Sequence, residues 1–253
     1  MNSLKEDKVS IITPTYNSQE HIGKTIESIQ AQSYGNWELL ITDDYSTDAT
    51  VDIIYSFQKN DSRIKLYRLK KNQGPGEARN NSIKLSSGRF IAFCDSDDQW
   101  RAKKLEKQIS FMKNNKLAFS CTTYEVIDET GKKIRIEKPP KQLNYKLMLC
   151  NNYVGCLTAI YDTNILGKQY MPTIRKRQDW VLWLKIFQQI GQTQALDENL
   201  AIYLDRSRSI SSNKLIMIKY NWMVYRNELG FNIIKSFVFL IIFTLYYAKK
   251  RLF

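Results

Sequence analysis

The sequence predicts an α/β fold in which helices flank a mixed, mainly parallel sheet. Seven runs in the first half alternate between β-rich and amphipathic character, at 9–13, 19–32, 37–42, 48–58, 64–68, 76–85 and 89–94. Strands that are separated by helices in this way pair in parallel, and the helices form right-handed crossover connections. Polar residues cluster directly after three of the strands, and the ligands of open parallel sheets lie beyond those strand ends.

The first helix is predicted by the spacing of its apolar residues. Ile22, Ile26 and Ile29 recur at helical spacing and share one face. Asn17 is followed three residues later by Glu20, which is typical of a capping box. We therefore expect these two side chains to cap the first turn of this helix.

The second half is less regular and is expected to complete a mixed sheet. Apolar runs at 116–127 and 154–161 predict strands, and a further helix opens at Gln178. Trp180 and Trp183 lie along one side of that helix. We expect this half to build the site of a second substrate.

Length and composition fit one large domain with a short appendage. The chain has 253 residues, of which 43% are hydrophobic, and can bury a full-sized core. We expect the domain over 1–214, with a first half at 1–110 and a second at 111–214. Amphipathic or hydrophobic helices are expected over 215–253.

The charge balance and the cysteines limit the class of partner and the compartment. Lys and Arg number 38 against 25 Asp and Glu, a formal net charge of +13. This favours a nucleic acid, an anionic lipid surface or a phosphorylated substrate, and charge alone does not choose among them. The four cysteines show no CxxC spacing and are expected as buried, reduced thiols of a cytosolic protein. The polar first residues lack the apolar stretch of a signal peptide.

Carboxylates gather after two of the predicted strands. Asp43 and Asp44 follow one strand, and Asp95, Asp97 and Asp98 follow another. Carboxylates at neighbouring strand ends repel one another, so a cation or donors from a ligand must offset them. Mg²⁺ or Mn²⁺ bridging to a diphosphate would do so, because hard cations prefer carboxylate and phosphate oxygens. A single Asp-x-Asp taken alone is equally typical of a solvated turn.

The three strand ends together resemble the inverting family-2 glycosyltransferases of the GT-A fold. That family has a strand ending in P-x-Y-N, then one ending in D-D-x-S-x-D, then a D-x-D-D segment; here they read VSIITPTYN, WELLITDDYSTDAT and GRFIAFCDSDDQW. The resemblance is close over about the first 110 residues. It implies a GT-A type, Rossmann-like fold and inverting transfer of a sugar from a nucleoside-diphosphate donor. Since members of this family commonly use UDP-sugars, the resemblance favours a UDP-sugar as the donor.

The resemblance also implies a nucleotide pocket at these strand ends. Residues expected beside the base are Pro14, Thr15, Tyr16 and Asn17. Asp44 would accept a hydrogen bond from the base. Asp95 and Ser96 would lie by the ribose, with Asp95 also near metal-bound water. Asp97 would be the main ligand of Mn²⁺ or Mg²⁺.

A segment at 71–80 matches the family pattern N-x-G-x-x-x-A-R-N. It adds Asn72, Gly74 and Arg79 to the expected nucleotide site. Glycine permits close backbone approach, and the guanidinium fork suits nucleotide or phosphate. The alternative for Arg79 is a surface salt bridge, with Glu77 or Asp61 as partner.

Inverting transfer needs a carboxylate that removes a proton from the acceptor hydroxyl. The segment around Asp179 resembles the family motif E-D-x-x-L-W, whose aspartate is that base, with Gln178 in place of the usual glutamate. Gln178 and Trp180 are therefore expected at the acceptor site. The alternatives are a helix N-terminal charge for Asp179 and core packing for the tryptophans.

A later tract resembles a loop of cell-wall and O-antigen transferases related to teichuronic acid synthesis. It contains Arg206 and Arg208, which could clamp the donor phosphates as a lid. Leu204 stands where the family usually has an arginine. The alternative is a basic, serine-rich surface loop that binds no ligand.

The apolar run at 236–248 is short for a membrane span, which needs ~20 apolar residues. A helix lying in the interface fits better, with flanking cations on anionic headgroups and a lipid-linked glycan acceptor nearby. This places the protein peripherally on the inner face of a bacterial cell membrane. A buried terminal helix or a homodimer contact is the alternative.

Two other classes of function remain. A sugar nucleotidyltransferase also uses paired carboxylates on Mg²⁺, but it normally has a glycine-rich basic first loop, where this chain has Pro14 to Asn17. A non-catalytic basic module that binds membrane or nucleic acid would explain the charge but not the carboxylates. We therefore expect an enzyme of polysaccharide biosynthesis without a nucleic-acid partner.

Overall fold

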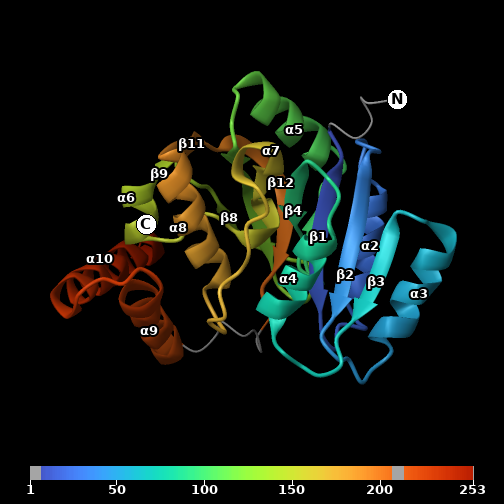
Figure 1. Cartoon of the computed structure of the whole chain (residues 1–253), viewed down its shortest axis with the longest axis horizontal. Helices are drawn as coiled ribbons and strands as arrows, with labels where there is room; N and C mark the ends of the chain where they lie inside the picture. The colour runs from blue at the N-terminus through green and yellow to red at the C-terminus, as the bar shows by residue number, and fades with distance from the viewer. Residues whose placement is uncertain (1–6, 207–213, 253) are drawn as a thin grey trace.

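The computed structural model describes residues 7–206 and 214–252, and shows a central sheet between layers of helices, with a helical pair at one end (Figure 1). The main sheet has six strands in the order β3-β2-β1-β4-β10-β6. They are β1 (Val9–Thr15), β2 (Trp37–Asp43), β3 (Ile64–Arg68), β4 (Phe90–Phe93), β10 (Ile160–Asp162) and β6 (Phe119–Ser120). The first four pair in parallel, and β10 is antiparallel to both β4 and β6.

Two smaller sheets complete the second half. A four-stranded sheet has the order β5-β12-β7-β8, and β11 pairs with β9. Their strands are β5 (Gln99–Trp100), β12 (Leu196–Leu204), β7 (Thr122–Ile127), β8 (Lys133–Glu137), β11 (Gln192–Gln194) and β9 (Gln142–Asn144). The mixed, mainly parallel sheet expected from the sequence is thus present.

Helices cover both faces of the main sheet, and two more form the pair at the end of the molecule (Figure 1). They are α2 (Ile22–Gln30), α3 (Thr50–Asn60), α4 (Pro75–Leu85), α5 (Lys104–Asn114), α6 (Tyr145–Cys150), α7 (Thr163–Leu166), α8 (Gln178–Ile190), α9 (Lys214–Met223) and α10 (Ile233–Leu252), with a 3-10 turn at Cys156–Thr158 and a π-helical turn at Val224–Glu228. Ile11 and Leu39 face a cluster with α2 and α5, whereas Ile12 and Leu40 face one with α4 and α8. Because β-strand side chains alternate in direction, each strand serves two cores.

The predicted capping box at the first helix is wrong. The helix begins at Ile22, and His21 precedes it without a side-chain cap. Asn17 is instead in a left-handed conformation, with φ of 45°, and its Oδ1 accepts a hydrogen bond from the Thr47 amide at 2.9 Å. The asparagine joins two strand-end loops, so its side chain is not available to the helix.

Two predicted strands of the second half are each divided. The run at 116–127 forms β6 and β7, because β6 pairs with β10 in the main sheet and β7 pairs with β12 in the second sheet. The chain passes from one sheet to the other at Cys121, which is fully buried. The run at 154–161 begins with the 3-10 turn and only then enters β10. All four cysteines are free, and two of them are buried.

The C-terminal helices pack against the second half of the chain. The Trp180 ring of α8 lies 5.5 Å from that of Tyr225 and 4.9 Å from that of Phe243 on α10, centroid to centroid. Within the described ranges, no helix combines the length and apolarity that crossing a membrane requires. The division of the chain at residue 214 stays a prediction.

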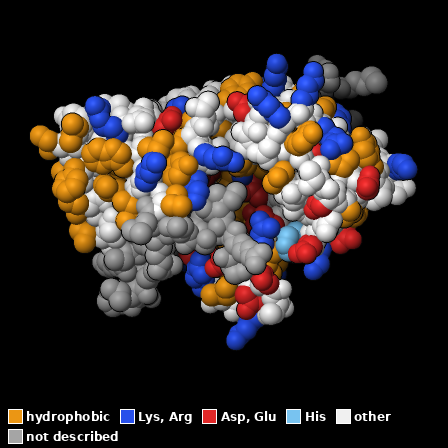
Figure 2. All heavy atoms as spheres, turned by 90° about the horizontal axis from the view of Figure 1, so that it is seen from below, with side chains coloured by type: hydrophobic (Ala, Val, Ile, Leu, Met, Phe, Trp, Pro, Cys, Tyr) orange, Lys and Arg blue, Asp and Glu red, His pale blue; other side chains and the backbone are white. Residues whose placement is uncertain are grey.

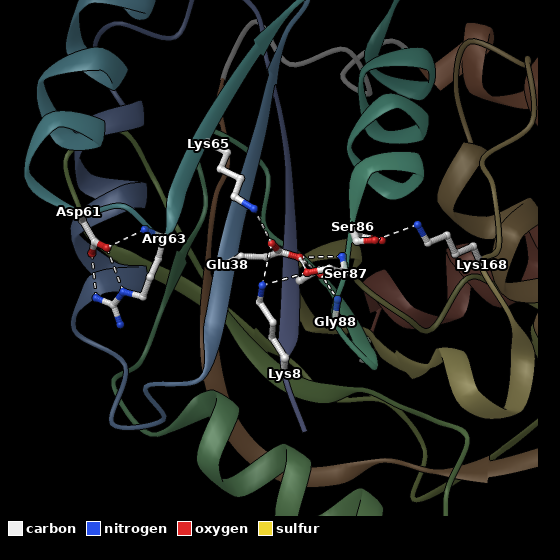
Figure 3. Close-up of polar contacts among 10 residues, drawn as sticks. Lys8, Glu38, Asp61, Arg63, Lys65, Ser86, Ser87, Gly88 and Lys168 are labelled. Atoms are coloured by element: carbon white, nitrogen blue, oxygen red, sulfur yellow. Dashed lines mark hydrogen bonds and ion pairs between the residues drawn. The ribbon is translucent and has the colours of Figure 1, made fainter. Parts of the chain in front are cut away.

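A buried carboxylate ties the strands together near their amino ends (Figure 3). Glu38 is 1% exposed and accepts hydrogen bonds from Ser10 Oγ at 2.7 Å, Lys8 Nζ at 2.9 Å, Lys65 Nζ at 3.0 Å and the Ser87 amide at 2.7 Å. Burial alone would raise the pKa of Glu38, but these donors lower it to about 2. This cluster fixes the sheet edge opposite to the loops described next.

Candidate functional site

The loops that follow β1, β2 and β4 touch one another at the carboxyl edge of the sheet. The Asn17 amide donates to Ser46 Oγ at 2.9 Å, which joins the first two loops. Ser18 Oγ lies 2.8 Å from Ser96 Oγ, which joins the first loop to the third. Figure 2 shows this side of the molecule, with acidic side chains inside a hollow. The structure therefore gathers the three expected strand ends around one site.

Asp44 holds the loop that the sequence assigns to the nucleotide. It is 3% exposed, and its two carboxylate oxygens accept hydrogen bonds from the amides of Gln73 and Gly74, each at 2.7 Å. Asn72 Nδ2 donates to the Asp44 carbonyl at 3.2 Å. Gly74 has φ of 91°, which favours glycine. These expected residues therefore lie together.

Two tyrosines stand open at the same edge. Tyr16 is 49% exposed and Tyr45 is 51% exposed, although the residues before them are buried. Tyr45 is also in the left-handed region, with φ of 72°, a conformation that is uncommon for bulky residues and often marks functional sites. Thr15 Oγ1 is buried without a hydrogen-bond partner. Tyr45 was not identified from the sequence, because backbone conformation leaves no signal in residue type there.

Arg79 pairs with Asp95 rather than with a surface carboxylate. Its Nη2 donates to both oxygens of Asp95, at 2.6 and 2.7 Å, and its Nη1 donates to Gln178 Oε1 at 3.3 Å. Burial opposes the charge of Arg79, yet the nearby Asp95 raises its pKa overall. A surface salt bridge with Glu77 or Asp61 is wrong, since Arg79 is only 8% exposed.

Negative charge is concentrated after β4. Burial raises the pKa of Asp97. The positive charge of Arg206 works in the other direction, since Arg206 Nη2 lies 2.5 Å from Asp97 Oδ2. Burial and repulsion by Asp97 and Asp95 raise the pKa of Asp98 further, and Asp98 Oδ1 is buried without a partner. The carboxylates here are thus incompletely compensated by the protein. Of the two lid arginines, Arg206 reaches this cluster, and Arg208 lies outside the described residues.

Asp179 occupies the first turn of α8, beside the Arg79 pair. Asn152 Nδ2 donates to Asp179 Oδ2 at 3.1 Å, a contact missed in the sequence because the two residues are 27 positions apart. The adjacent Gln178 packs on the bare backbone of Gly76, where an added Cβ would lie 2.4 Å from Gln178 Nε2. The start of α8 therefore fits closely against the start of α4.

Trp180 is not available as a sugar platform, which corrects that expectation. Both Trp180 and Trp183 are fully buried, and the Trp180 indole donates to the Met148 carbonyl at 2.7 Å. Trp183 lies 5.4 Å from Phe93 and 5.2 Å from Phe119, ring centroid to ring centroid. Both tryptophans anchor α8 in the core.

A cavity of about 370 Å³ opens between the start of α4 and the loop before α8. Most of the residues that line it are polar, with amides and both signs of charge; they are Lys71, Asn72, Gln73, Glu77, Pro172, Thr173 and Gln178. It shares Gln178 with the Arg79 pair and two residues with the loop held by Asp44. The cavity is thus continuous with the expected site.

Comparisons with known proteins agree with this geometry. The family model "Glycosyl transferase family 2" matches residues 10–193. The chain is 39% identical to the putative teichuronic acid biosynthesis glycosyltransferase TuaG of Bacillus subtilis, over 96% of this chain and 97% of that protein. It is 40% identical to the Escherichia coli WfgD, a UDP-Glc:alpha-D-GlcNAc-diphosphoundecaprenol beta-1,3-glucosyltransferase, over 85% and 84% of the two chains.

Solved structures show the same fold at low identity. S. aureus TarS in complex with UDP-GlcNAc matches with a TM-score of 0.73 at 20% identity, over 94% of this chain and 71% of that one. Mannosyltransferase PcManGT from Pyrobaculum calidifontis, in complex with GDP-Man and Mn²⁺, matches with a TM-score of 0.64 at 15% identity, over 92% and 69%. Strand-end motifs, fold and family model agree, and the chain is a glycosyltransferase that belongs to glycosyl transferase family 2.

Proposed function

We propose that this glycosyltransferase moves a sugar, with inversion, from a UDP-sugar to a hydroxyl of a lipid-linked surface glycan, with Asp179 as general base. One observation carries the proposal: Arg79 contacts Asp95 of the expected donor site and Gln178, the residue before Asp179. One guanidinium therefore joins the carboxylate of the expected donor site to the residue that precedes the proposed base.

The donor side rests on the loops after β1 and β2. Tyr16 is exposed beside the buried Thr15, so its ring is free to lie against a nucleobase. Asp44 holds Gly74 next to the same edge, which brings bare backbone toward the ligand. The relative WfgD is named for UDP-Glc, and the TarS structure contains UDP-GlcNAc. These relatives favour a uridine nucleotide for this chain.

The carboxylates after β4 suit a divalent cation shared with a diphosphate. Among the described residues, no three His, Cys, Asp or Glu side chains form a group that could hold a metal by themselves. Mg²⁺ commonly uses one or two carboxylates and completes its shell with phosphates and water, so Asp97 with Asp95 would suffice. Asp98 Oδ1 is buried without a hydrogen-bond partner, and repulsion from Asp95 and Asp97 favours a positive charge nearby. When bound, the cation would stabilise negative charge on the departing diphosphate.

On the acceptor side, Asp179 has the environment of a general base. The Asn152 amide occupies one of its oxygens at 3.1 Å, which orients the carboxylate. Asp179 is partly exposed, and its neighbour Gln178 lines the polar cavity. This cavity would bring a sugar hydroxyl to the residue next to the proposed base. We place the acceptor glycan there.

The helical pair at the end of the molecule would hold the enzyme on an anionic membrane. Several large apolar side chains of this pair are exposed, namely Ile216, Ile218, Ile233, Ile234, Phe237, Val238, Ile241, Leu245 and Tyr246. Figure 2 shows hydrophobic side chains gathered at this end. An apolar face on a chain of charge +13 suits the inner surface of a bacterial membrane. WfgD is named for a diphosphoundecaprenol acceptor, which is a lipid-linked substrate.

The test is transfer by the purified full chain from a panel of UDP-sugars with Mn²⁺ to lipid-linked glycan acceptors. The product is expected to carry the inverted anomeric configuration by NMR. Asp179→Asn should abolish transfer but leave UDP binding unchanged. Asp52→Asn is the matched control, because Asp52 also lies in a first helical turn but on the exposed side of α3. Substantial turnover by Asp179→Asn would refute the assignment of the base.

A further inference from the structure

The start of α8 is held in a conformation that its own residues do not favour. Arg177, which precedes the helix, has φ of 66° and ψ of 18°, and no side chain caps the helix there. The left-handed region is less favourable for an arginine than the right-handed one, because Cβ comes too close to the following carbonyl oxygen. Contacts from elsewhere in the fold must therefore hold this residue.

Those contacts come from the C-terminal helices. Arg177 Nε donates to Asn221 Oδ1 of α9 at 2.9 Å, and Asn221 is only 4% exposed. The Arg177 guanidinium also lies 5.4 Å from the ring of Phe243 on α10 and 5.7 Å from that of Trp180. Arg177 thus connects both C-terminal helices to the first turn of α8.

The same turn contains Asp179, two residues after Arg177. Its carboxylate direction depends on the path by which the backbone enters the helix. A shift of about 1 Å in a reacting group can cost about 100-fold in rate. The hydrogen bond from Asn152 fixes the side chain of Asp179 but not the backbone before it. Gln178 is held there by Arg79 and by the close approach of Gly76, and Arg177 with its partner on α9 adds a second restraint on the backbone.

We propose that Asn221 is a positioning residue, which sets the general base through Arg177 and makes the C-terminal helices part of the catalytic machinery. The inference rests on the proposed function, in which Asp179 is the base. Asn221 is buried, and it accepts its hydrogen bond from Arg177 and not from Asp179. Its removal should impair turnover and leave donor binding unchanged.

The test uses the full chain with Asn221→Ala, Asn221→Asp and Arg177→Lys. We expect Asn221→Ala to lower kcat about 10-fold, with the KM for the UDP-sugar unchanged within about 2-fold. Asn221→Asp should restore most of the rate, because a carboxylate also accepts from the guanidinium. Arg177→Lys should lower kcat as well, and provides a second variant should Asn221→Ala fold poorly. The control is Asn227→Ala, which removes the same side chain from an exposed position nearby.

Hydrogen exchange provides a measurement that does not depend on activity. In Asn221→Ala, amides of the first turn of α8 should exchange faster, whereas those after β4 should be unchanged. Unchanged kcat and unchanged exchange in Asn221→Ala would overturn the inference, as would equal losses in Asn221→Ala and Asn221→Asp. If Asp179→Asn kept full turnover, the proposed function would fail. The exchange result would still decide whether Asn221 holds the start of α8.

Discussion

Arg79 and Asp95 form a two-pronged ion pair, with Arg79 Nη2 at 2.6 and 2.7 Å from the two carboxylate oxygens. The pair joins α4 to the end of β4, and it is largely buried on the arginine side. Removing one partner of a buried pair leaves an uncompensated charge, which costs about 3–5 kcal/mol. Both donor geometry and stability therefore depend on this contact.

Arg79→Lys should weaken UDP binding about 10-fold, since an ammonium cannot reproduce the guanidinium fork. Calorimetry with UDP and Mn²⁺ measures the change. Asp95→Asn combined with Arg79→Lys should lose less than the sum of the two single losses, because the residues act as a pair. Arg79→Glu would bring two carboxylates together and should abolish binding. Unchanged donor affinity in Arg79→Glu would remove Arg79 from the nucleotide site.

Glu38 predicts an acid-dependent part of the stability. Its pKa in the folded protein is about 2, below the ordinary value of 4.5, so its contribution is complete above pH 4.5 and is lost as the pH falls toward 2. Glu38→Gln should lower the free energy of unfolding by about 2 kcal/mol at pH 7. The difference between the two proteins should shrink at pH 3, as measured by urea unfolding. Catalysis should be spared, because the cluster lies at the other end of the strands.

Substitution of two glycines is expected to affect different properties, namely stability at Gly88 and activity at Gly76. A Cβ on Gly88 would lie 2.6 Å from the Lys8 carbonyl and 2.7 Å from the Ser10 amide, both backbone atoms. Gly88→Ala should therefore destabilise the protein by about 1–3 kcal/mol, seen in urea unfolding. At Gly76 the obstacle is the flexible end of Gln178, which can move aside. Gly76→Ala should cost less stability but lower activity, because Gln178 then leaves Arg79.

Asp97→Asn should separate stability from function. Because the pKa of Asp97 is raised, its charged form opposes folding at pH 7, and the neutral amide should raise the Tm without ligand by about 2–4 °C. The further rise in Tm on adding UDP with Mn²⁺ should be lost. Asp197→Asn removes only a surface ion pair with Lys138, so it should change the Tm little and should keep the response to UDP with Mn²⁺. A full UDP and Mn²⁺ response in Asp97→Asn would exclude it as the main metal ligand.

Membrane docking is best tested by single outward-facing residues. Phe243 packs on Trp180, so deleting α10 would also disturb the core. Ile234→Glu and Phe237→Glu should instead reduce co-sedimentation with anionic vesicles by at least about 10-fold, because each places a charge in the proposed lipid contact. Ile165→Glu, at an exposed site on α7, should sediment like the unchanged protein. Concentration-dependent dimerisation lost in the same two variants would assign this face to a second copy.

The first half of the fold could be predicted from the sequence because short β-rich runs alternate regularly with amphipathic ones. β1, β2 and β3 lie within two residues of the expected ranges. The second half could not be predicted as well, since apolar character does not show which sheet a strand joins. The run that divides at Cys121 is equally apolar on both sides of the division.

The candidate site was predicted where residues stand next to a strand end in the sequence. Asp44 and Asp95 carry such a signal, and Arg79 was found through the family pattern at 71–80. Asn152 and Asn221 carry neither signal. Asn221 meets Arg177 across 44 positions, and asparagine in a helix has no pattern that marks a distant partner. Asn17 is the opposite case. Its capping-box pattern is present in the sequence, but its side chain accepts a hydrogen bond from the loop after β2 and does not cap α2.

The close fit of Gly76 and Gln178 bears on how this enzyme could be recombined with its relatives. The two residues come from different halves of the chain, and their backbone and side chain occupy adjoining space. A chimera that joins the first half of one enzyme to the second half of another keeps the fit only when both positions travel together. Where one parent has a larger residue at either position, the two halves of the chimera should clash at this contact, and the chimera should lose activity even though each half is intact.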